Sequence, residues 1–320
     1  MPTKVFIDGS EGTTGLRLAD RLRGRAEIEL LSIDPALRKD VSERARIANS
    51  ADIVFLCLPD AAAIEAVAGI TNPLTRVIDA STAHRVQGDW AYGLPELSAA
   101  HRDAVKNSKR VAVPGCYATG FVLAAYPLVN EGIATPSYPF TCFGISGYSG
   151  GGRTVIENYR DKNRPEYYTS PRQYALGLTH KHLPEMQKIT GLQAPPLFSP
   201  VICDIYAGMT VTIPLQLRLL EKKMSAKDLH TFLCDYYAGQ KAVRVMDFGA
   251  HESYESGMID IEHMAGLDTL ELYVSGHEDQ AMLISRMDNL GKGSSGAAVQ
   301  CMNFMCGFDE MAGLEINKDH

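Results

Sequence analysis

The residue best suited to covalent chemistry in this 320-residue sequence is Cys116, which lies in the segment Val113-Pro-Gly-Cys-Tyr-Ala-Thr-Gly120. An apolar, strand-like run ends at this segment, and a helix-like run over residues 121–125 follows it. A helix N-terminus stabilises a thiolate, because free backbone N–H groups and the positive end of the helix dipole favour negative charge there. The pattern therefore predicts a nucleophile, although a small buried cysteine fits the same spacing.

A second segment, His180-Lys-His182-Leu-Pro-Glu185, offers the base that a cysteine nucleophile needs. A histidine that a carboxylate orients is a general acid/base, which makes His180, His182 and Glu185 catalytic candidates. Two histidines and a carboxylate could also bind a metal, but no further ligand cluster accompanies them, and we predict no metal. The other alternative is a solvated loop that leads into an ordinary short helix.

A third segment, Gly9-Ser-Glu-Gly-Thr-Thr-Gly15, follows the first apolar run of the chain. Glycines between a strand and a helix let the backbone approach a pyrophosphate, whose charge the helix N-terminus accepts. Asp34 would favour NAD through the ribose 2′-hydroxyl, whereas Ser32 with Arg38 would favour NADP through its 2′-phosphate, and the spacing leaves both open. A plain glycine turn is the alternative. The predicted cofactor contacts in this segment are Gly9, Ser10, Gly12, Thr13, Thr14 and Gly15.

Two arginines are candidate anion contacts. Arg153 ends the glycine-rich segment Gly147-Tyr-Ser-Gly-Gly-Gly-Arg153, and Arg85 ends Ser81-Thr-Ala-His-Arg85. A guanidinium suits phosphate or carboxylate because it donates two parallel hydrogen bonds. A glycine turn beside a surface arginine explains the first segment equally well, and the same alternative applies to Arg85.

Composition excludes several classes of protein. The net charge of −7 and the lack of a Lys/Arg-rich run argue against nucleic acid, and no apolar stretch approaches the length of a membrane span. The N-terminus has no signal-peptide hydrophobic region. The seven cysteines are odd in number and scattered, without a close Cys-x-x-Cys pair. We therefore expect reduced thiols and a cytoplasmic location.

The elements that must position these residues fall into two groups. Apolar runs at residues 4–7, 28–33, 52–58 and 76–80 alternate with helical patterns at 13–22 and 61–68, which predicts a Rossmann-type, doubly wound parallel sheet. Beyond Cys116, residues 211–217 and 270–274 show the period-2 alternation of a one-sided antiparallel sheet. Ser225 and Asp228 form a capping-box pattern before a helix. A last helix, at about 295–305, is expected to return to the first domain.

The fold class is therefore α/β, with a second α+β domain whose sheet is mostly antiparallel. We expect the first domain to comprise residues 1–117 with a C-terminal return over 295–320, and to bind the dinucleotide. Residues 118–294 then form the catalytic and oligomerisation domain.

Six motifs together resemble the N-acetyl-gamma-glutamyl-phosphate reductase family, specifically its more compact group, which is related to aspartate-semialdehyde dehydrogenase. The resemblance runs nearly end to end and is most specific where the cysteine segment is followed by H-x-H-x-P-E. The motifs are GSEGTTG at 9–15, YGLPEL at 92–97, VPGCYATG at 113–120, SGYSGGGR at 146–153, HKHLPE at 180–185 and DNLGKGSSGAAVQ at 288–300.

The resemblance implies an NADPH-dependent enzyme of arginine biosynthesis. It would reduce N-acetyl-L-glutamyl 5-phosphate through a Cys116 thioester to N-acetyl-L-glutamate 5-semialdehyde, and it would release inorganic phosphate. The histidine pair would supply the acid/base, and His182 is favoured because it stands next to Leu-Pro-Glu. The resemblance also implies cofactor contacts at Pro59, Ser81, Asn289, Gly293 and Gly296. Ser149 joins Arg153 and Arg85 as an implied substrate contact, and a homodimer or homotetramer is expected.

Three other interpretations compete with this one. A relative with the same chemistry could act on a different acyl phosphate, as aspartate-semialdehyde or aminoadipate-type enzymes do. A cysteine hydrolase or acyltransferase would also use a cysteine and a histidine, but it would leave the glycine loop without a role. A non-enzymatic dinucleotide sensor would leave Cys116 without one.

Overall fold

The computed structural model describes residues 1–316 and divides the chain into two compact units. The first comprises Met1–Gly115 with Ser294–Leu314, and the second comprises Cys116–Gly293 with the residues from Glu315 onward. The expected boundaries at 117/118 and 294/295 differ from these by one or two residues. Glu315 belongs to the second unit, where it exchanges backbone and side-chain hydrogen bonds with Asp268. Residues 317–320 of the expected C-terminal return lie outside the described residues.

The first unit contains a parallel sheet in the strand order β2-β1-β3-β4-β6-β5, and all of its strand pairings are parallel. Its central strands are continuous apolar runs, as in Ile53–Leu56, where every side chain is buried. A sheet that is covered on both faces requires such runs, because neither face meets water. The strands are β1 (Thr3–Asp8), β2 (Ile28–Leu31), β3 (Ile53–Leu56), β4 (Arg76–Asp79), β5 (Ala91–Tyr92) and β6 (Arg110–Ala112).

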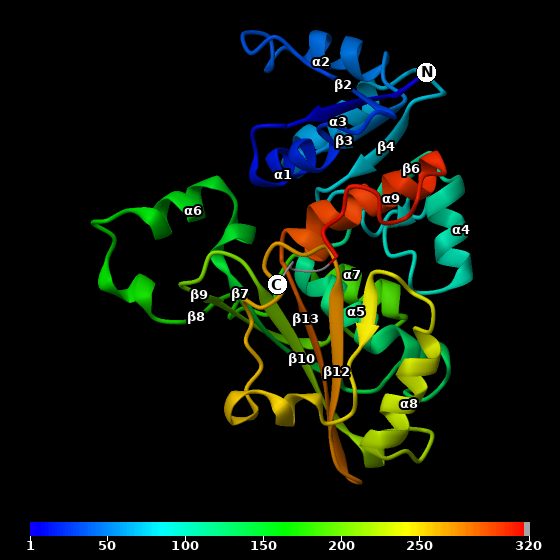
Figure 1. The fold of residues 1–320 in the computed structure, drawn as a ribbon, viewed down its shortest axis with the longest axis vertical. Helices are drawn as coiled ribbons and strands as arrows, with labels where there is room; N and C mark the ends of the chain where they lie inside the picture. Colours follow the sequence, from blue (N-terminus) through cyan, green and yellow to red (C-terminus); the bar gives the residue numbers. More distant parts are fainter. Residues whose placement is uncertain (317–320) are drawn as a thin grey trace. The chain divides into compact units, whose positions relative to one another are not determined.

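Helices cover both faces of this sheet and form two separate apolar cores (Figure 1). One core contains side chains of α1 (Thr13–Leu22), α4 (Ala99–Asn107) and α9 (Gly296–Cys306). The other contains side chains of α2 (Val41–Ala48) and α3 (Asp60–Gly69). The predicted doubly wound domain is confirmed, and so is the return of the last helix to it.

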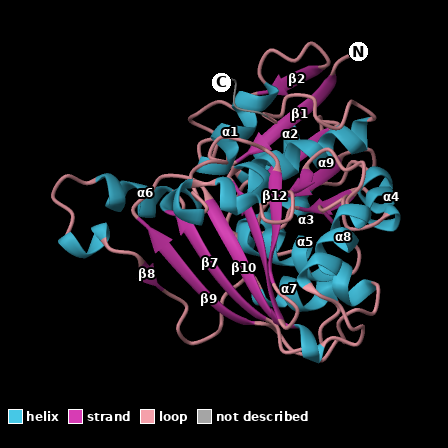
Figure 2. Ribbon diagram, turned by 60° about the horizontal axis from the view of Figure 1, so that its bottom comes forward, coloured by secondary structure: helices cyan, strands magenta, loops and turns pink. Residues whose placement is uncertain are grey.

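The second unit contains a seven-stranded mixed sheet in the order β11-β12-β13-β10-β7-β9-β8 (Figure 2). Four of its six pairings are antiparallel, and the pairings β7 with β9 and β11 with β12 are parallel. The predicted, mostly antiparallel sheet is therefore confirmed. The strands are β7 (Thr141–Gly147), β8 (Arg172–Gln173), β9 (Leu197–Cys203), β10 (Met209–Gln216), β11 (Val243–Val245), β12 (Leu270–Gly276) and β13 (Gln280–Met287).

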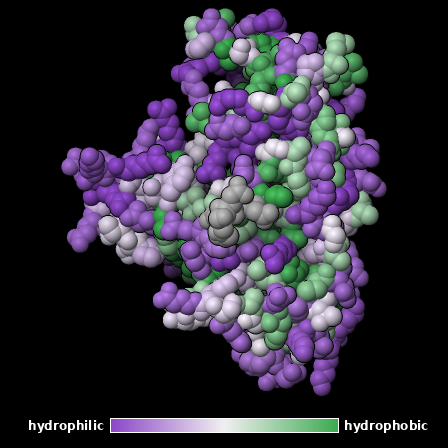
Figure 3. Space-filling model, in the orientation of Figure 1, coloured by the Kyte–Doolittle hydropathy of each residue, from purple (hydrophilic) through white to green (hydrophobic). Residues whose placement is uncertain are grey.

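Helices pack on one face of the second sheet. α5 (Cys116–Asn130) lies on β10 and β13, α8 (Ala226–Tyr236) lies on the β11–β12–β13 end, and α7 (Leu183–Thr190) packs against α5. α8 begins with the capping box that the sequence predicts, since Ser225 and Asp228 each accept a hydrogen bond from the other's backbone N–H. α6 (Arg153–Arg160) lies in a segment that projects beside β8 and β9 and carries mainly hydrophilic side chains (Figures 1 and 3).

Short helices complete the chain. A π-helix, Gly291–Ser295, directly precedes α9. The 3₁₀ helices are Tyr148–Gly151, Glu166–Thr169, Leu217–Leu219, Ala250–Ser253 and Glu255–Gly257.

Candidate active site

Cys116 is the first residue of α5, and β6 ends four residues before it. This confirms the predicted strand-to-helix junction, a position at which a helix N-terminus favours negative charge. Cys116 is partly buried, and Gly293 of the π-helix lies against it. A Cβ atom added at Gly293 would stand 2.8 Å from the Cys116 Cβ. The backbone at Gly293 thus lies so close to Cβ of Cys116 that only glycine fits there without a shift.

Tyr117 links the cysteine to the two histidines. Its ring centroid lies 5.8 Å from that of His180 and 6.0 Å from that of His182. Its hydroxyl donates to Ser146 Oγ at 2.8 Å and accepts from the Tyr174 hydroxyl at 3.3 Å. Burial raises the pKa of the Tyr117 hydroxyl, and the nearby Tyr174 and Cys116 raise it further. Tyr117 therefore stays protonated at neutral pH and acts as a hydrogen-bond donor.

His180 and His182 form a compact pair with ring centroids 4.6 Å apart. His180 Nδ1 accepts a hydrogen bond of 3.1 Å from the backbone N–H of His182. This hydrogen bond stabilises the turn before α7. His182 is buried and stands immediately before α7, and Glu185 is buried in the first turn of that helix. Residues three apart on a helix share a face, which places Glu185 on the His182 side of α7.

Asn289 ties two loops of the second unit together, although it is almost completely buried, with 1% of its surface exposed. Its Oδ1 accepts from the Gly208 N–H at 3.1 Å, and its Nδ2 donates to Ser149 Oγ at 3.0 Å. Ser149 is also fully buried. The predicted cofactor contact of Asn289 and substrate contact of Ser149 remain predictions. In the structure, the side chains of Asn289 and Ser149 hold the glycine-rich segment that precedes α6.

Asp288 organises the π-helix that carries Gly293. Its Oδ1 accepts from the N–H groups of Leu290 at 2.6 Å and Gly291 at 3.1 Å, and its carbonyl accepts from the Gly293 N–H. Its Oδ2 accepts from the Gly266 N–H at 2.6 Å. The carboxylate therefore satisfies backbone donors that a π-turn would otherwise leave unpaired.

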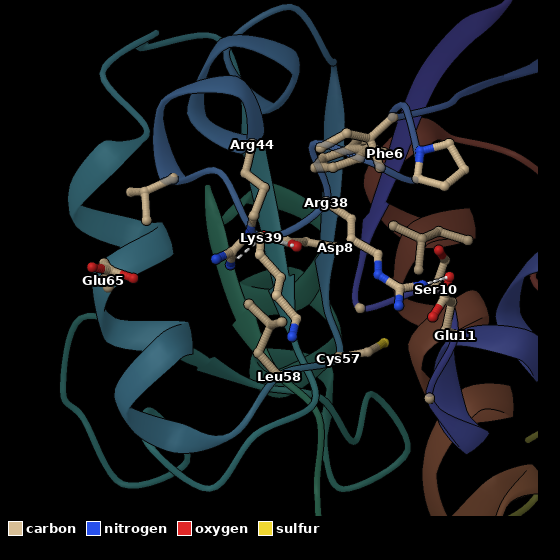
Figure 4. Close-up of a pocket in the computed structure, with 16 residues that line it drawn as sticks. Phe6, Asp8, Ser10, Glu11, Arg38, Lys39, Arg44, Cys57, Leu58 and Glu65 are labelled. Carbon is tan, nitrogen blue, oxygen red and sulfur yellow. Dashed lines mark hydrogen bonds and ion pairs between the residues drawn. The ribbon is translucent and has the colours of Figure 1, made fainter.

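A pocket of about 560 Å³ opens beside the glycine loop of the first unit (Figure 4). The loop is shaped by close backbone contacts, because Cβ atoms added at Gly9 and Gly15 would stand 2.4 Å from Cys57 O and 2.3 Å from Gly9 O. Of the predicted cofactor contacts, Gly9, Ser10, Gly12 and Arg38 line the pocket. A glycine loop at the start of a helix, with cations in the lining of the same pocket, has the chemistry that a dinucleotide needs.

The pocket also contains two cations that the sequence analysis did not single out, Lys39 and Arg44. Arg44 forms an ion pair with Asp8 at the end of β1, in which Nε and Nη2 donate to both carboxylate oxygens. This pair raises the pKa of Arg44. Asp34, by contrast, accepts from the Ala36 N–H and so stabilises the turn after β2.

The remaining predicted cofactor contacts lie around the carboxyl ends of the first sheet and near α9. Pro59 directly precedes α3, and the buried Ser81 donates to Asp79 Oδ2 at 2.6 Å. Thr14 Oγ1 lies 3.5 Å from Ser294 Oγ. Ser32 follows β2, Thr13 begins α1, and Gly296 begins α9. Their contacts with a cofactor remain predictions.

The two predicted anion contacts have very different surroundings. Arg85 is buried in the first unit, where Nε donates to Val113 O at 2.9 Å and Nη2 donates to Ala80 O at 3.1 Å. These two hydrogen bonds connect the segment after β4 with the segment after β6. Arg153 is exposed at the start of α6, and its Nε forms an ion pair with Glu157 at 2.7 Å. Substrate contact by either arginine remains a prediction.

Sequence reasoning missed Tyr117, Asp288, Lys39 and Glu11 as residues of interest. Tyr117 was adjacent to the cysteine, and Glu11 stood inside the glycine loop, so position could have suggested both. Asp288 opens the motif DNLGKGSSGAAVQ, so that motif could have suggested it, whereas Lys39 gave no local signal. Within residues 1–316, no group of three His, Cys, Asp or Glu side chains is placed to hold a metal ion. No helix of that part of the chain combines the length and the apolarity needed to cross a membrane.

Two family profiles match the chain. "Semialdehyde dehydrogenase, NAD binding domain" matches residues 4–107, and "Semialdehyde dehydrogenase, dimerisation domain" matches residues 116–289. The solved structure of aspartate semialdehyde dehydrogenase II from Vibrio cholerae superposes with a TM-score of 0.72 and 15% identity, over 96% of this chain and 99% of that one. The Candida albicans aspartate semialdehyde dehydrogenase, solved with NADP, has a TM-score of 0.65 at 15% identity, with coverage of 96% and 99%. At this identity, these similarities establish the fold.

Curated relatives are much more similar in sequence. The N-acetyl-gamma-glutamyl-phosphate reductase of Chelativorans sp. is 46% identical over 311 residues, which are 95% of this chain and 98% of the relative. N-acetyl-gamma-glutamyl-phosphate reductase 2 of Nostoc sp. is 42% identical over 319 residues, with coverage of 97% and 99%. With this identity over almost its whole length, and with both semialdehyde dehydrogenase profiles matched, the chain belongs to the N-acetyl-gamma-glutamyl-phosphate reductase family of phosphorylating dehydrogenases.

Proposed function

We propose that this enzyme reduces N-acetyl-L-glutamyl 5-phosphate to N-acetyl-L-glutamate 5-semialdehyde with NADPH, in the cytoplasm, as a step of arginine biosynthesis. The observation that carries the proposal is the placement of Cys116 at the start of α5, with the ring of Tyr117 beside both His180 and His182. A nucleophile and an acid/base are thereby built into one unit of the fold.

The reaction begins at the Cys116 sulfur. The thiolate attacks the carbonyl carbon of the acyl phosphate, the bond from that carbon to the phosphate oxygen breaks, and inorganic phosphate leaves. The thioester that forms is an uncharged electrophile, whereas the acyl phosphate repels further negative charge. NADPH, when bound, supplies the hydride that reduces the thioester.

We assign the acid/base role to His182 and a positioning role to His180. His180 Nδ1 already accepts from the His182 backbone, which ties its ring to the turn. His182 protonates the oxyanion that follows reduction, and it removes the proton again as the carbon–sulfur bond breaks to release the aldehyde and the Cys116 thiolate. Glu185, on the same face of α7, orients His182. Arg153 contacts the phosphate or the substrate carboxylate.

The preference for NADPH is supported by Arg38 and Lys39, which both line the pocket at the glycine loop. Two cations in the pocket lining suit a 2′-phosphate, whereas Asp34 is not among the residues that line this pocket. Glycines 9, 12 and 15 would hold the pyrophosphate.

The direct test is a stopped assay of semialdehyde oxidation with phosphate, run with NADP and with NAD, and with N-acetylglutamate semialdehyde and aspartate semialdehyde. We expect N-acetylglutamate semialdehyde and NADP to be the preferred pair. Cys116→Ser should lower kcat by at least about 10³-fold, because it removes the nucleophile. Cys203→Ser, which changes a partly exposed thiol of the same unit, should leave the rate unchanged. A turnover rate of Cys116→Ser above a few percent of the wild-type rate would contradict the thioester mechanism.

We also propose a homodimer that forms through the exposed part of the second sheet's other face. The face opposite α5 and α8 carries exposed apolar side chains on neighbouring strands, with Phe143 41%, Leu197 56% and Met282 43% exposed. An apolar sheet face of this kind marks an interaction surface. The profile that matches residues 116–289 describes a dimerisation domain in its family.

A further inference from the structure

The wall of the dinucleotide pocket contains an ion pair between the glycine loop and the segment after β2. Glu11 stands between Gly9 and Gly12, and its Oε1 pairs with Nη1 of Arg38 (Figure 4). Both residues line the pocket, and their side chains are 60% and 47% exposed. The pair therefore joins the loop expected to hold the pyrophosphate to an arginine expected to hold the 2′-phosphate.

The three cations of the pocket differ in how readily they can turn to a new anion. Arg44 is fixed by three hydrogen bonds to Asp8, and both side chains of that pair are largely buried. Removing one partner from such a pair leaves a buried charge uncompensated, which opposes rearrangement. The Arg38 pair faces water, where an ion pair contributes little to stability, so Arg38 can exchange partners. Lys39 projects across the pocket beside it (Figure 4).

A carboxylate at this position has two effects on an incoming 2′-phosphate. It occupies the guanidinium that would otherwise donate to the phosphate, and it adds negative charge to the wall of the same pocket. Neither effect acts on a 2′-hydroxyl, which is uncharged.

We infer that Glu11 is a specificity-determining residue, which holds Arg38 in the free enzyme and weakens binding of the 2′-phosphorylated cofactor relative to its unphosphorylated form. This inference rests on the proposed use of NADPH for the identity of the ligand. Arg38 must leave Glu11 when the 2′-phosphate binds, and the carboxylate sets how unfavourable that exchange is.

The experiment measures binding rather than turnover. NADPH and NADH are titrated against wild type and Glu11→Gln by cofactor fluorescence, and adenosine 2′,5′-bisphosphate is titrated by calorimetry. Glu11→Gln should tighten binding of NADPH and of the bisphosphate by about two- to fivefold and should leave NADH nearly unchanged. Glu43→Gln is the matched control, because Glu43 pairs with Arg46 on α2 and lies outside the lining of this pocket.

A second variant tests the mechanism. In an Arg38→Gln background the gain from Glu11→Gln should shrink, because the carboxylate no longer competes for the guanidinium. If Glu11→Gln bound NADPH as tightly as wild type or more weakly, the inference would be overturned. Glu11 would then have no effect on NADPH binding, or would favour it by positioning Arg38. The proposed function fails separately, if wild type binds NADH as tightly as NADPH. A wild type without that preference, combined with a gain in Glu11→Gln, would support the role of Glu11 and remove only the NADPH assignment.

Discussion

At the scale of single residues, the environment of Cys116 is set as much by a missing side chain as by the groups that are present. Gly293 leaves the space that Cβ of Cys116 occupies, and Gly144 leaves the space that the ring of Tyr117 occupies. A Cβ at Gly144 would stand 2.5 Å from Tyr117 Cε1. Because Tyr117 also contacts both histidines, two glycines help to fix where the proposed nucleophile and the proposed acid/base lie.

Gly293→Ala should lower kcat/KM by about 10²-fold, because the new methyl group collides with Cys116 Cβ and must displace the thiol. The measurement is the semialdehyde assay, combined with the rate at which iodoacetamide alkylates Cys116. Gly88→Ala serves as the control, since the space around a Cβ at Gly88 is open. Activity of Gly293→Ala within twofold of wild type would show that the backbone at this position does not constrain the nucleophile.

At the scale of elements, the segment Asp288-Asn289 holds the π-helix and two loops of the second unit in place. Asp288 fixes the π-helix Gly291–Ser295 through its backbone N–H groups, and Asn289 fixes the glycine-rich segment before α6 through Ser149. Both side chains are buried, so these hydrogen bonds have no competition from water.

Asn289→Ala should destabilise the protein by about 1–3 kcal/mol, because the buried Gly208 N–H loses its acceptor. Urea unfolding measures this loss, and cofactor titration of the same variant separates the two possible roles of Asn289. Ser149→Ala is the matched control, since it removes one partner of Asn289 and leaves the Gly208 bond intact. Unchanged stability with strongly weakened cofactor binding would instead assign Asn289 to the cofactor alone.

At the scale of the whole molecule, the two units follow the division that the sequence periodicities suggest. Continuous apolar strands form the sheet that helices cover on both faces, and alternating strands form the sheet that helices cover on one face. On the other face of the second sheet, residues around Tyr254 and Asp260 contact β12 and β13, and the part that exposes Phe143, Leu197 and Met282 is the proposed dimer surface.

Phe143→Asp should convert the proposed dimer to monomers, because a carboxylate buried between two sheets without a partner is strongly unfavourable. Sedimentation velocity at micromolar concentration measures the change. Leu74→Asp is the control, since Leu74 is 80% exposed and lies in the first unit. If Phe143→Asp sediments as wild type does, the exposed part of that face is not the interface.

The sequence by itself determined the local features: the strand-to-helix junction at Cys116, the glycine loop at the start of α1, the capping box of α8 and the types of both sheets. Each of these depends on hydrophobic periodicity or on backbone sterics within a few residues, which is why a single sequence can reveal it. The same local logic identified the histidine pair next to a buried carboxylate on α7.

Only the tertiary structure decided what the side chains do. It brought Gly293 against Cys116, committed Arg85 to two backbone carbonyls, buried Asn289 between two loops and paired Arg38 with Glu11. The hydrogen-bond partners of each polar side chain come from distant parts of the sequence. Which partner the side chain takes depends on its burial and on the distances in the fold, and no local sequence pattern encodes these.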